Sequence, residues 1–450
     1  MRRGRPARLL LLGVSVRALA ASACRGRLWR ERHPGGLIAL DYFGDADLLD
    51  LARRRRFEAI SLARDLRRPR SIPGLVRAAL DLDWQALVYA GGLENRPGLL
   101  ALLERRGALL GNDPTGVRRL RDPSIFFPFL RAAGLPHPPT WIVSEAARRR
   151  SGLEPPPAGA GRPLLWKRVR SGGGGGVQPA RAGEACPRGH YLQELLPGRP
   201  GSIAFVADGQ AAVVLGVSEQ ISGWADLGGS GFRYGGSIAG PPEDLLPPGA
   251  LGLLEEAAGA LTRRFGLRGL NGLDFVLSSG LPHLLEVNPR YTASMELLEE
   301  MGRVSLFDLH LEALAGRLPE RTTRTGVAPP LVAALPESAP GDRDRLAATR
   351  SSASADSAGG RRFLAKGILY AEVPVRGIEP ALLAELGARD LPIRGEAIGA
   401  GQPICTLMTE GDSPEACRDS LVAVAGRARS LIASAQRPSR QALPELRGTW

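Results

Sequence analysis

The sequence predicts a mixed α/β and α+β fold with several domains, and three observations support this prediction. The chain has 450 residues, of which 44% are hydrophobic, so it is long enough for about two to four globular domains. Residues 1–110 alternate short, continuous apolar runs with helical stretches, which is typical of a parallel sheet buried on both faces. Residues 163–317 and 363–430 instead contain strand-like runs joined by glycine-rich turns, with helices beside them.

The opening segment, MRRGRPARLLLLGVSVRALAASAC, has two interpretations. A basic start, an apolar run and small residues before Cys24 imitate a signal peptide. The same residues fit a buried strand over Leu9–Leu12, a turn at Gly13 and a helix with Arg17 in its first turn. Because the apolar run is short and Arg17 ends it, we favour the strand and helix. No other stretch approaches the length of a membrane span.

Further elements follow along the chain. The segments GLIALDYFGDADL and DWQALVYAGGLENRPGLLALLERRG each begin with a strand, and a helix lies near residues 72–80. A smaller helical part over 111–162 ends in a Pro/Gly-rich loop, and helices are expected at 249–265 and 291–316. The segment 338–362 is low in complexity, and two β-like pieces with a closing helix follow it. No G-x-G-x-x-G follows the first strand, so a dinucleotide site has little support.

The positive charge of the chain does not by itself indicate a nucleic-acid partner. The chain has 59 lysines and arginines against 46 acidic residues, but only Lys167 and Lys366 are lysines. The arginines are scattered and are not interleaved with aromatic residues, so we expect neither a nucleic-acid nor a membrane partner. Where arginine is the default cation, a retained lysine suggests a site that the planar guanidinium does not fit, with chance retention as the alternative. The four cysteines form no C-x-x-C pair, and a disulfide framework is not expected in a chain of this length, so we favour a reducing compartment and a cytoplasmic protein.

The segment LLWKRVRSGGGGGV places Lys167 on a strand that leads into Ser171 and five consecutive glycines. Glycines allow successive backbone N–H groups to form a concave nest for phosphate oxygens, and the lysine adds a compact cation. The lysine precedes the glycines, so the segment is not a Walker A loop. A flexible linker is the alternative, since the chain contains 57 glycines.

Two other segments carry weaker signals. In HYLQELLPGRPGSIAFVADG, a strand with Gln193 and Glu194 bends at Pro197-Gly198 and resumes, so it could link two small domains and present backbone groups to an adenine edge. The alternative is an ordinary strand–turn–strand. In SGFRYGGSIAG, Arg233 and Tyr234 either line an acceptor site or belong to a plain hairpin.

The segment GLNGLDFVLSSGLPHLLEVNPR contains two strand-like runs on either side of an SSG turn, which indicates a hairpin. Alternation places Glu286 and Asn288 on one face, and a three-residue loop over Ser279–Leu281 would put Asp274 directly across from Glu286. Two carboxylates and an amide oxygen are hard ligands suited to Mg²⁺. Arg290 would then face negative charge on a transferred phosphoryl group. The alternative is a surface hairpin with scattered polar residues.

Taken together, the lysine–glycine loop, the Gln-Glu hinge and the LDF…LLEVNPR hairpin resemble the ATP-grasp ligases over about residues 111–317. The run YAGGLENRP…LLGN…RDP is further similar to a subgroup of ATP-dependent carboligases related to biotin carboxylase. The resemblance implies an N-terminal α/β pre-grasp domain over 1–110 and an ATP-grasp domain of two α+β subdomains over 111–320. It also implies a linker over 321–362 and a small β-rich domain with a closing helix over 363–450.

The resemblance also implies roles for residues at matching positions. Lys167 corresponds to the lysine that contacts the ATP phosphates, and Arg290 to the arginine that faces the transferred phosphoryl group and the acyl substrate. The remaining residues form three sets, which are the glycine loop over the phosphates (Gly173, Gly174 and Gly175), the adenine hinge (Gln193, Glu194 and Leu196) and the Mg²⁺ ligands (Asp274, Glu286 and Asn288). Mn²⁺ is an alternative metal for the same ligands.

Two positions depart from the family pattern. Many members carry a second lysine where this chain reads LRDPSIF, with Asp122-Pro123 at that position, so Arg121 or Arg118 would have to substitute for it. Many also carry an acidic residue for the ribose after the hinge, where this chain has Pro200. These changes bear on nucleotide binding and leave the three metal ligands untouched.

The sequence therefore predicts an ATP- and Mg²⁺-dependent ligase that joins a carboxylate to an amine-type nucleophile through an acyl phosphate. Small-molecule carboxylates and amines are the expected partners. The oligomeric state stays open, with a homodimer as one option. Two other functions also stay open, namely a non-catalytic nucleotide-binding or regulatory protein on the same scaffold and a small-molecule kinase.

Overall fold

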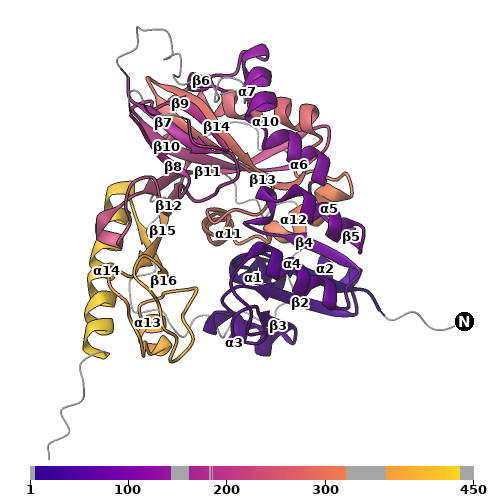
Figure 1. Ribbon diagram of the computed structural model, residues 1–450, viewed down its shortest axis with the longest axis vertical. Helices are drawn as coiled ribbons and strands as arrows, with labels where there is room; N and C mark the ends of the chain where they lie inside the picture. The colour runs from indigo at the N-terminus through magenta and orange to yellow at the C-terminus, as the bar shows by residue number, and fades with distance from the viewer. Residues whose placement is uncertain (1–5, 143–161, 182–183, 185, 321–360, 436–450) are drawn as a thin grey trace, which may run out of the picture.

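A computed structural model of the protein describes residues 6–142, 162–181, 184, 186–320 and 361–435, and these residues form three sheets (Figure 1). A five-stranded parallel sheet belongs to the N-terminal domain, and a four-stranded and a seven-stranded antiparallel sheet follow it. Most of the expected Pro/Gly-rich loop and nearly all of the low-complexity segment lie outside the described residues. Each helix in the described ranges is too short or too polar to cross a bilayer.

The N-terminal domain is an open α/β unit, as the alternation of apolar runs predicts. Leu9 and Leu11 pack into one hydrophobic core and Leu10 and Leu12 into another, so the first strand is buried on both faces and its interpretation as a strand is confirmed. The strands, in the order β3-β2-β1-β4-β5, are β1 (Arg8–Leu12), β2 (Gly36–Asp41), β3 (Glu58–Ser61), β4 (Ala86–Tyr89) and β5 (Ala108–Leu109). The helices are α1 (Arg17–Arg25), α2 (Leu28–Arg32), α3 (Ala46–Arg55), α4 (Ile72–Asp81), the 3₁₀ helix η1 (Leu93–Asn95) and α5 (Pro97–Glu104).

Two short helices, α6 (Pro114–Leu120) and α7 (Pro123–Ala132), lead into the four-stranded sheet. The Asp122 side chain caps α7 by accepting the Ser124 N–H, and Pro123 occupies the first helical position. Asp122 and Pro123, where the chain departs from the family pattern, therefore begin helix α7. The sheet, in the order β6-β9-β7-β8, contains β6 (Thr140–Trp141), β7 (Leu164–Arg168), β8 (Val177–Ala180) and β9 (His190–Glu194).

The seven-stranded sheet has helices on both faces. Alternate residues of one inner strand pack against different cores, with Phe205 in the core of the long helix α10 and Val206 in the core that α12 shares with the N-terminal domain. The strands, in the order β14-β13-β10-β11-β12-β15-β16, are β10 (Arg199–Asp208), β11 (Ala212–Ser222), β12 (Tyr234–Gly240), β13 (Arg268–Ser278), β14 (Leu281–Asn288), β15 (Phe363–Tyr370) and β16 (Pro403–Gly411). The helices are η2 (Ala225–Leu227), α9 (Pro242–Leu245), α10 (Ala250–Phe265), α11 (Met295–Gly302), α12 (Leu306–Leu314), α13 (Pro380–Glu385) and α14 (Pro414–Ala435).

The expected helical stretch over 291–316 is two helices. Arg303 follows α11 with a left-handed φ of 51°, which ends that helix, and Ser305 caps the next one by accepting the Asp308 N–H.

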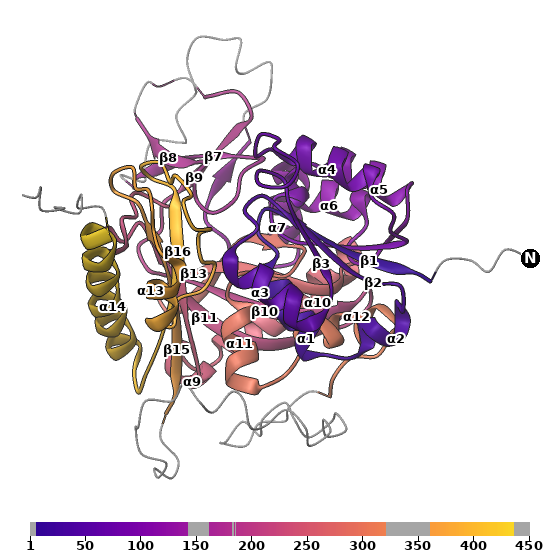
Figure 2. The same ribbon diagram turned by 90° about the horizontal axis from the view of Figure 1, so that it is seen from below.

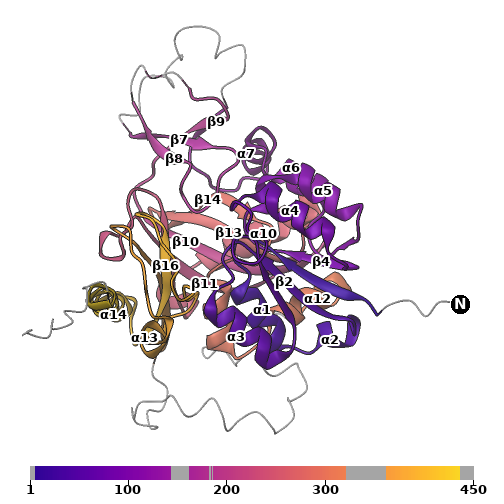
Figure 3. The same ribbon diagram turned by 60° about the horizontal axis from the view of Figure 1, so that its bottom comes forward.

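The C-terminal strands extend the sheet of the preceding domain. β15 pairs with β12, and β16 pairs with β15, so both join the seven-stranded sheet. Figures 2 and 3 show the N-terminal domain and the C-terminal segment on opposite sides of the molecule, with the four-stranded sheet projecting beyond them. The sequence did not indicate this pairing across the linker.

A cluster of buried and half-buried charges joins the N-terminal domain, α11 and the C-terminal segment. The Glu296 carboxylate pairs with Arg17, with Lys366 Nζ at 2.7 Å and with Arg389 Nη1 at 2.7 Å. Arg17 Nε also lies 2.9 Å from Asp390 Oδ1. Burial alone would raise the pKa of Glu296, but the three cations hold it well below its usual range. These five residues are termed the interdomain cluster.

Candidate active site

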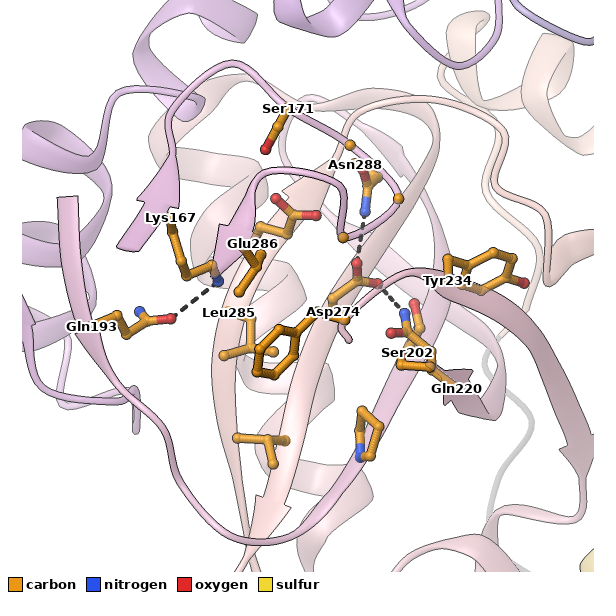
Figure 4. Close-up of a pocket in the computed structure, with 18 of the residues that line it drawn as sticks. Lys167, Ser171, Gln193, Ser202, Gln220, Tyr234, Asp274, Leu285, Glu286 and Asn288 are labelled. Atoms are coloured by element: carbon orange, nitrogen blue, oxygen red, sulfur yellow. Dashed lines mark hydrogen bonds between the residues drawn. The ribbon is translucent and has the colours of Figure 1, made fainter. Parts of the chain in front are cut away.

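A pocket of about 500 Å³, termed the central pocket, lies between the four-stranded and seven-stranded sheets (Figure 4). Polar side chains from β7, β9, β13 and β14 point toward it, and Phe127, Leu165 and Val276 form part of its apolar wall. The site residues predicted from the sequence that line it are Lys167, Gly173, Gly174, Gln193, Glu194, Leu196, Asp274, Glu286, Asn288 and Arg290.

The glycine loop between β7 and β8 is docked on residues 231–234. The Tyr234 N–H donates to the Gly173 carbonyl oxygen at 3.0 Å, and a Cβ on Gly174 would lie only 1.7 Å from the Phe232 carbonyl oxygen. Gly173 and Gly174 also have positive φ values of 61° and 74°. Only glycine suits both positions, because a side chain would be strained at either and would clash at the second.

Gly175 differs from its two neighbours. It does not line the central pocket, and a Cβ there would have no neighbour closer than 3.9 Å. Its φ also lies outside the left-handed region. Nothing in the loop geometry requires glycine here, so its part in phosphate binding stays a prediction.

The segment from β9 to β10 is a hinge between two sheets, as its strand–bend–strand pattern suggested. β9 ends at Glu194 in the four-stranded sheet, and β10 begins at Arg199 in the seven-stranded sheet. Gln193 Nε2 donates to the Thr140 hydroxyl at 2.9 Å, and Lys167 Nζ donates to Gln193 Oε1 at 3.1 Å. The hinge thus presents polar atoms beside apolar walls, an arrangement suited to a flat heteroaromatic ring.

The hairpin of β13 and β14 pairs Asp274 with Glu286, as expected, but the turn length and the register that produce this pair differ from the prediction. The turn has two residues, Ser279 and Gly280, with φ values of 50° and 79°, instead of three. A β-bulge then shifts the register between Asp274 and the next residue, and leaves Leu285 without a partner in the ladder. The bulge supplies the offset that a longer loop would have given, and both Leu285 and Glu286 line the pocket.

The three predicted metal ligands lie close together in the structure (Figure 4). Asn288 Nδ2 donates to Asp274 Oδ2 at 3.0 Å, and Gln220 Nε2 donates to Asp274 Oδ1 at 2.9 Å. The described residues contain no group of three His, Cys, Asp or Glu side chains that could hold a metal, so a metal at this place would need the Asn288 amide oxygen beside the two carboxylates. Two carboxylates and one amide are the oxygen donors that Mg²⁺ prefers, and the residues present fit this ion.

The two carboxylates have opposite pKa shifts. Burial, and then the charge of Glu286, raise the pKa of Asp274 to about 6. Burial would also raise the pKa of Glu286, but the positive charges of Arg121, Lys167 and Arg290 outweigh it and lower that pKa. The three cations therefore favour the ionised form of Glu286, whereas burial and the neighbouring carboxylate disfavour that of Asp274.

Arg121 and Arg118 are the two candidates to replace the lysine that is missing at Asp122-Pro123, and Arg121 is the one that faces the pocket. Its Nη1 lies 2.9 Å from Glu286 Oε2, and its Nη2 lies 2.8 Å from the Ser171 carbonyl oxygen at the start of the glycine loop. Arg118, the other candidate, is exposed on α6. Pro200, at the second departure, also lines the pocket and offers no charge to a ligand.

Arg290 is held by the N-terminal domain. Its Nε donates to Glu94 Oε1 at 2.8 Å, and its Nη2 donates to Asn288 Oδ1 at 3.2 Å. Arg121 has a similar contact, because its Nη2 donates to Asn95 Oδ1 at 2.9 Å. Glu94 and Asn95 were not predicted as site residues, and the one local signal for them is their place just after a Gly-Gly turn at the carboxyl end of β4.

Arg233 and Tyr234 point to different places. Tyr234 lines the central pocket and stays a candidate for the acceptor site. Arg233 Nη1 donates to the Gly401 carbonyl oxygen at 2.8 Å, and its guanidinium lies 4.6 Å from the centre of the Tyr370 ring. The Tyr370 hydroxyl also donates to the Tyr234 carbonyl oxygen at 2.8 Å, so this segment is tied to the C-terminal strands.

Comparison with known proteins identifies the class of domain. Residues 126–294 match the family of ATP-grasp domains. These residues therefore form an ATP-grasp domain, and the ATP-grasp resemblance predicted from the sequence is confirmed for this part of the chain. Among curated proteins, the large chain of carbamoyl phosphate synthase from Thermomicrobium roseum is 27% identical over 246 residues, which cover 50% of this chain and 21% of that protein. The chain thus spans about a fifth of the length of the curated relatives it matches.

The similarity of fold extends over nearly the whole chain. The biotin carboxylase domain of Hydrogenobacter thermophilus 2-oxoglutarate carboxylase has a TM-score of 0.59 at 16% identity, over 93% of this chain and 89% of that one. The N5-carboxyaminoimidazole ribonucleotide synthetase from Thermus thermophilus has a TM-score of 0.54 at 20% identity, over 93% and 98% of the two chains. The fold is thus that of biotin carboxylase domains and their structural neighbours, which confirms the fold class.

Proposed function

We propose that the protein is an ATP- and Mg²⁺-dependent ligase that joins a carboxylate to an amine-type nucleophile through an acyl phosphate. The observation that carries this proposal is the pairing of Asp274 with Glu286, beside Asn288, in the same pocket as Lys167 and the glycine loop. The fold comparison gives further support, since the Hydrogenobacter domain was solved with MgADP and bicarbonate.

The nucleotide is proposed to span the pocket from the hinge to the glycine loop. The adenine would lie at Gln193, Glu194 and Leu196, which are buried beside the apolar wall. The phosphates would lie near Lys167 and the backbone of the glycine loop, where N–H groups and a cation can neutralise them. Arg121 would supply the second cation, and its fixed planar fork suits phosphate oxygens.

Asp274, Glu286 and Asn288 would hold Mg²⁺, with Mn²⁺ as an alternative ion. When bound, the metal neutralises charge on the phosphate oxygens. Arg290 is proposed to stabilise the charge that develops on the transferred phosphoryl group, because its guanidinium lies next to Asn288 and only 16% of its side chain is exposed.

The chemistry is proposed to take two steps. A carboxylate oxygen of the acyl substrate attacks the γ-phosphorus of ATP, the bond to the β–γ bridging oxygen breaks, and ADP leaves. The amine nitrogen then attacks the acyl carbon, phosphate leaves, and the amine loses its proton. The docked glycine loop would exclude water, which otherwise hydrolyses the acyl phosphate.

Bicarbonate is the first carboxylate to test, since it is bound in the Hydrogenobacter domain. Small primary amines are the first acceptors. We further propose a cytoplasmic location. A homodimer is the assembly to examine first, because that same domain is described as a dimer.

The decisive experiment measures ADP formation by the full chain with a panel of carboxylates and amines. We expect ADP release that requires Mg²⁺, one carboxylate and one amine together. If ATP binds but no pair stimulates ADP formation, the protein is a nucleotide-binding or regulatory protein instead. If a stable phosphorylated product accumulates without free phosphate, it is a small-molecule kinase.

A further inference from the structure

The 3₁₀ helix η1 belongs to the N-terminal domain, yet two of its side chains contact arginines of the central pocket. Glu94 Oε1 accepts from Arg290 Nε at 2.8 Å, and Asn95 Oδ1 accepts from Arg121 Nη2 at 2.9 Å. Two consecutive residues of one domain therefore hold two guanidinium groups that line a pocket in another.

η1 is itself held firmly. Leu93 is fully buried in the N-terminal core, and Glu94 is 1% exposed with its Oε2 accepting the Gly92 N–H at 2.6 Å. A Cβ on Gly92 would lie 2.7 Å from Ile72 and 2.8 Å from Val14, and its φ is 106°. The turn before η1 thus accepts only glycine. Glu94 has no freedom to follow its partner arginine if that side chain moves.

The two guanidinium groups reach different parts of the pocket. Arg121 contacts Glu286 at 2.9 Å and the Ser171 carbonyl oxygen at 2.8 Å, so it joins a proposed metal ligand to the glycine loop. Arg290 contacts Asn288 at 3.2 Å. Through these two arginines, η1 is connected to two proposed metal ligands, Glu286 and Asn288, and to the glycine loop.

We propose that Glu94 and Asn95 are positioning residues, which hold Arg290 and Arg121 so that the N-terminal domain sets the geometry of positive charge around the transferred phosphoryl group. The chemistry in this inference rests on the proposed ligase function.

The physical reason is competition between partners. An arginine beside unmatched carboxylates pairs with them when nothing else holds it, because an unpaired buried charge is costly. Released from Glu94, Arg290 would turn toward Asp274 or Glu286 and compete with the metal ion. The contact to Glu94 keeps Arg290 away from these two carboxylates, and the contacts to η1 together keep both guanidinium groups aimed at the phosphates.

Nucleotide binding tests the Asn95 contact without any acceptor substrate. The dissociation constant of the β,γ-imido analogue of ATP with Mg²⁺ is measured by calorimetry for wild type, Asn95→Ala, Arg121→Ala and the double variant. We expect each single change to raise it about tenfold and the double variant to raise it no further than about tenfold, because Asn95 acts through Arg121. If the effects multiply to about a hundredfold, the proposal is wrong.

A mimic of the transferring phosphoryl group tests the Glu94 contact. Glu94→Gln keeps the size of the side chain and removes the charge that holds Arg290. We expect it to weaken binding of MgADP with aluminium fluoride by about a hundredfold and binding of the imido analogue by less than about threefold. Glu94→Asp should give an intermediate loss. If Glu94→Gln weakens both complexes equally, Glu94 has only a structural role.

Glu104→Gln, an exposed change in the same domain, is the matched control and should leave both dissociation constants unchanged. Thermal unfolding of every variant checks the fold, and Glu94→Asp replaces Glu94→Gln if the latter does not fold. If wild type binds both complexes but no acid and amine pair stimulates ADP formation, the ligase function fails and the positioning result stands. If wild type binds neither complex, both are overturned.

Discussion

The central pocket and the interdomain cluster each contain one of the two lysines of the chain, and these lysines have opposite surroundings. Lys366 Nζ lies 2.7 Å from Glu296 Oε2 and 3.3 Å from the Ala293 carbonyl oxygen, in a buried cluster. Lys167 Nζ donates to the neutral amide of Gln193 and makes no salt bridge within the described part of the chain. The fold neutralises one lysine and leaves the charge of the other for a ligand.

The carboxylates show the same contrast. Glu296 is surrounded by cations that hold its pKa well below its usual range, whereas burial and a neighbouring carboxylate raise the pKa of Asp274 to about 6. Matched buried charges can hold domains together, while unmatched ones cost stability until a ligand completes them. The comparison therefore separates a structural cluster from a binding site built of the same residue types.

Breaking the interdomain cluster is expected to give the largest loss of stability. Glu296→Gln leaves Lys366 buried without its carboxylate and leaves Arg17 with Asp390 as its only carboxylate in the cluster, which should cost about 3–5 kcal/mol in the free energy of unfolding. Urea unfolding followed by circular dichroism measures the loss. Glu385→Gln, an exposed change on α13, is the control. A loss below about 1 kcal/mol would mean that the cluster does not hold the domains together.

Substitutions in the central pocket should lower turnover, and that of Lys167 should leave stability nearly unchanged. Lys167→Ala removes a charge that the fold has not neutralised, so turnover should fall about 100- to 1,000-fold while the free energy of unfolding changes by less than about 1 kcal/mol. Glu286→Gln should lower turnover by a similar factor, because it removes a metal ligand. Steady-state ADP formation and urea unfolding check both expectations. Unchanged turnover in either variant contradicts the site assignment.

A second buried glutamate of α11, Glu299, should make the stability of the protein depend on pH. Glu299 accepts hydrogen bonds from the Tyr291 hydroxyl at 2.9 Å and the Leu306 N–H at 2.7 Å, and burial raises its pKa from an ordinary 4.5 to about 7. The folded state thus binds this proton more tightly than the unfolded state does. Stability should therefore fall, by about 2–3 kcal/mol, as the pH rises from 4.5 through about 7.

Glu299→Gln removes this titration. Urea unfolding at pH 5 and pH 8 should show a smaller difference between the two conditions for the variant than for wild type. An equal or larger difference in the variant would show that another group carries the pH dependence.

The glycine loop offers the finest test of the pocket. Gly174→Ala places a Cβ against the Phe232 carbonyl oxygen and strains a left-handed residue, so the loop should undock and kcat/KM for ATP should fall about tenfold. Gly175→Ala has room for its methyl group and should change kcat/KM by less than about twofold. Steady-state kinetics compare the two adjacent variants, and equal effects would contradict the docked loop.

The hairpin shows how far the sequence leads. Alternation and the SSG turn predict that Asp274 and Glu286 face each other, and they do. The turn is one residue shorter than expected, and the bulge at Leu285 restores the register. Alternation indicates which residues share a face, but it does not indicate where a strand skips a residue, because that depends on packing against other strands.

Contacts between distant parts of the chain were not predictable. Glu94 and Arg290 are 196 residues apart, and no local pattern connects them. The same holds for the pairing of β12 with β15 across the linker. Arg121 was predictable only as one of two candidates, since both arginines lie on the same short helical segment and only the fold decides which one faces the pocket.

The pairing of β12 with β15 has a practical consequence for dissecting this protein. A fragment that stops at residue 320 would keep every lining residue of the central pocket but would leave the backbone of Gly236–Ala239 as an open sheet edge. Open edges recruit strands from other molecules and promote aggregation. The ATP-grasp domain is therefore not expected to be a separable unit. A soluble truncated form should need residues 361–435, either fused to the fragment or added as a second chain.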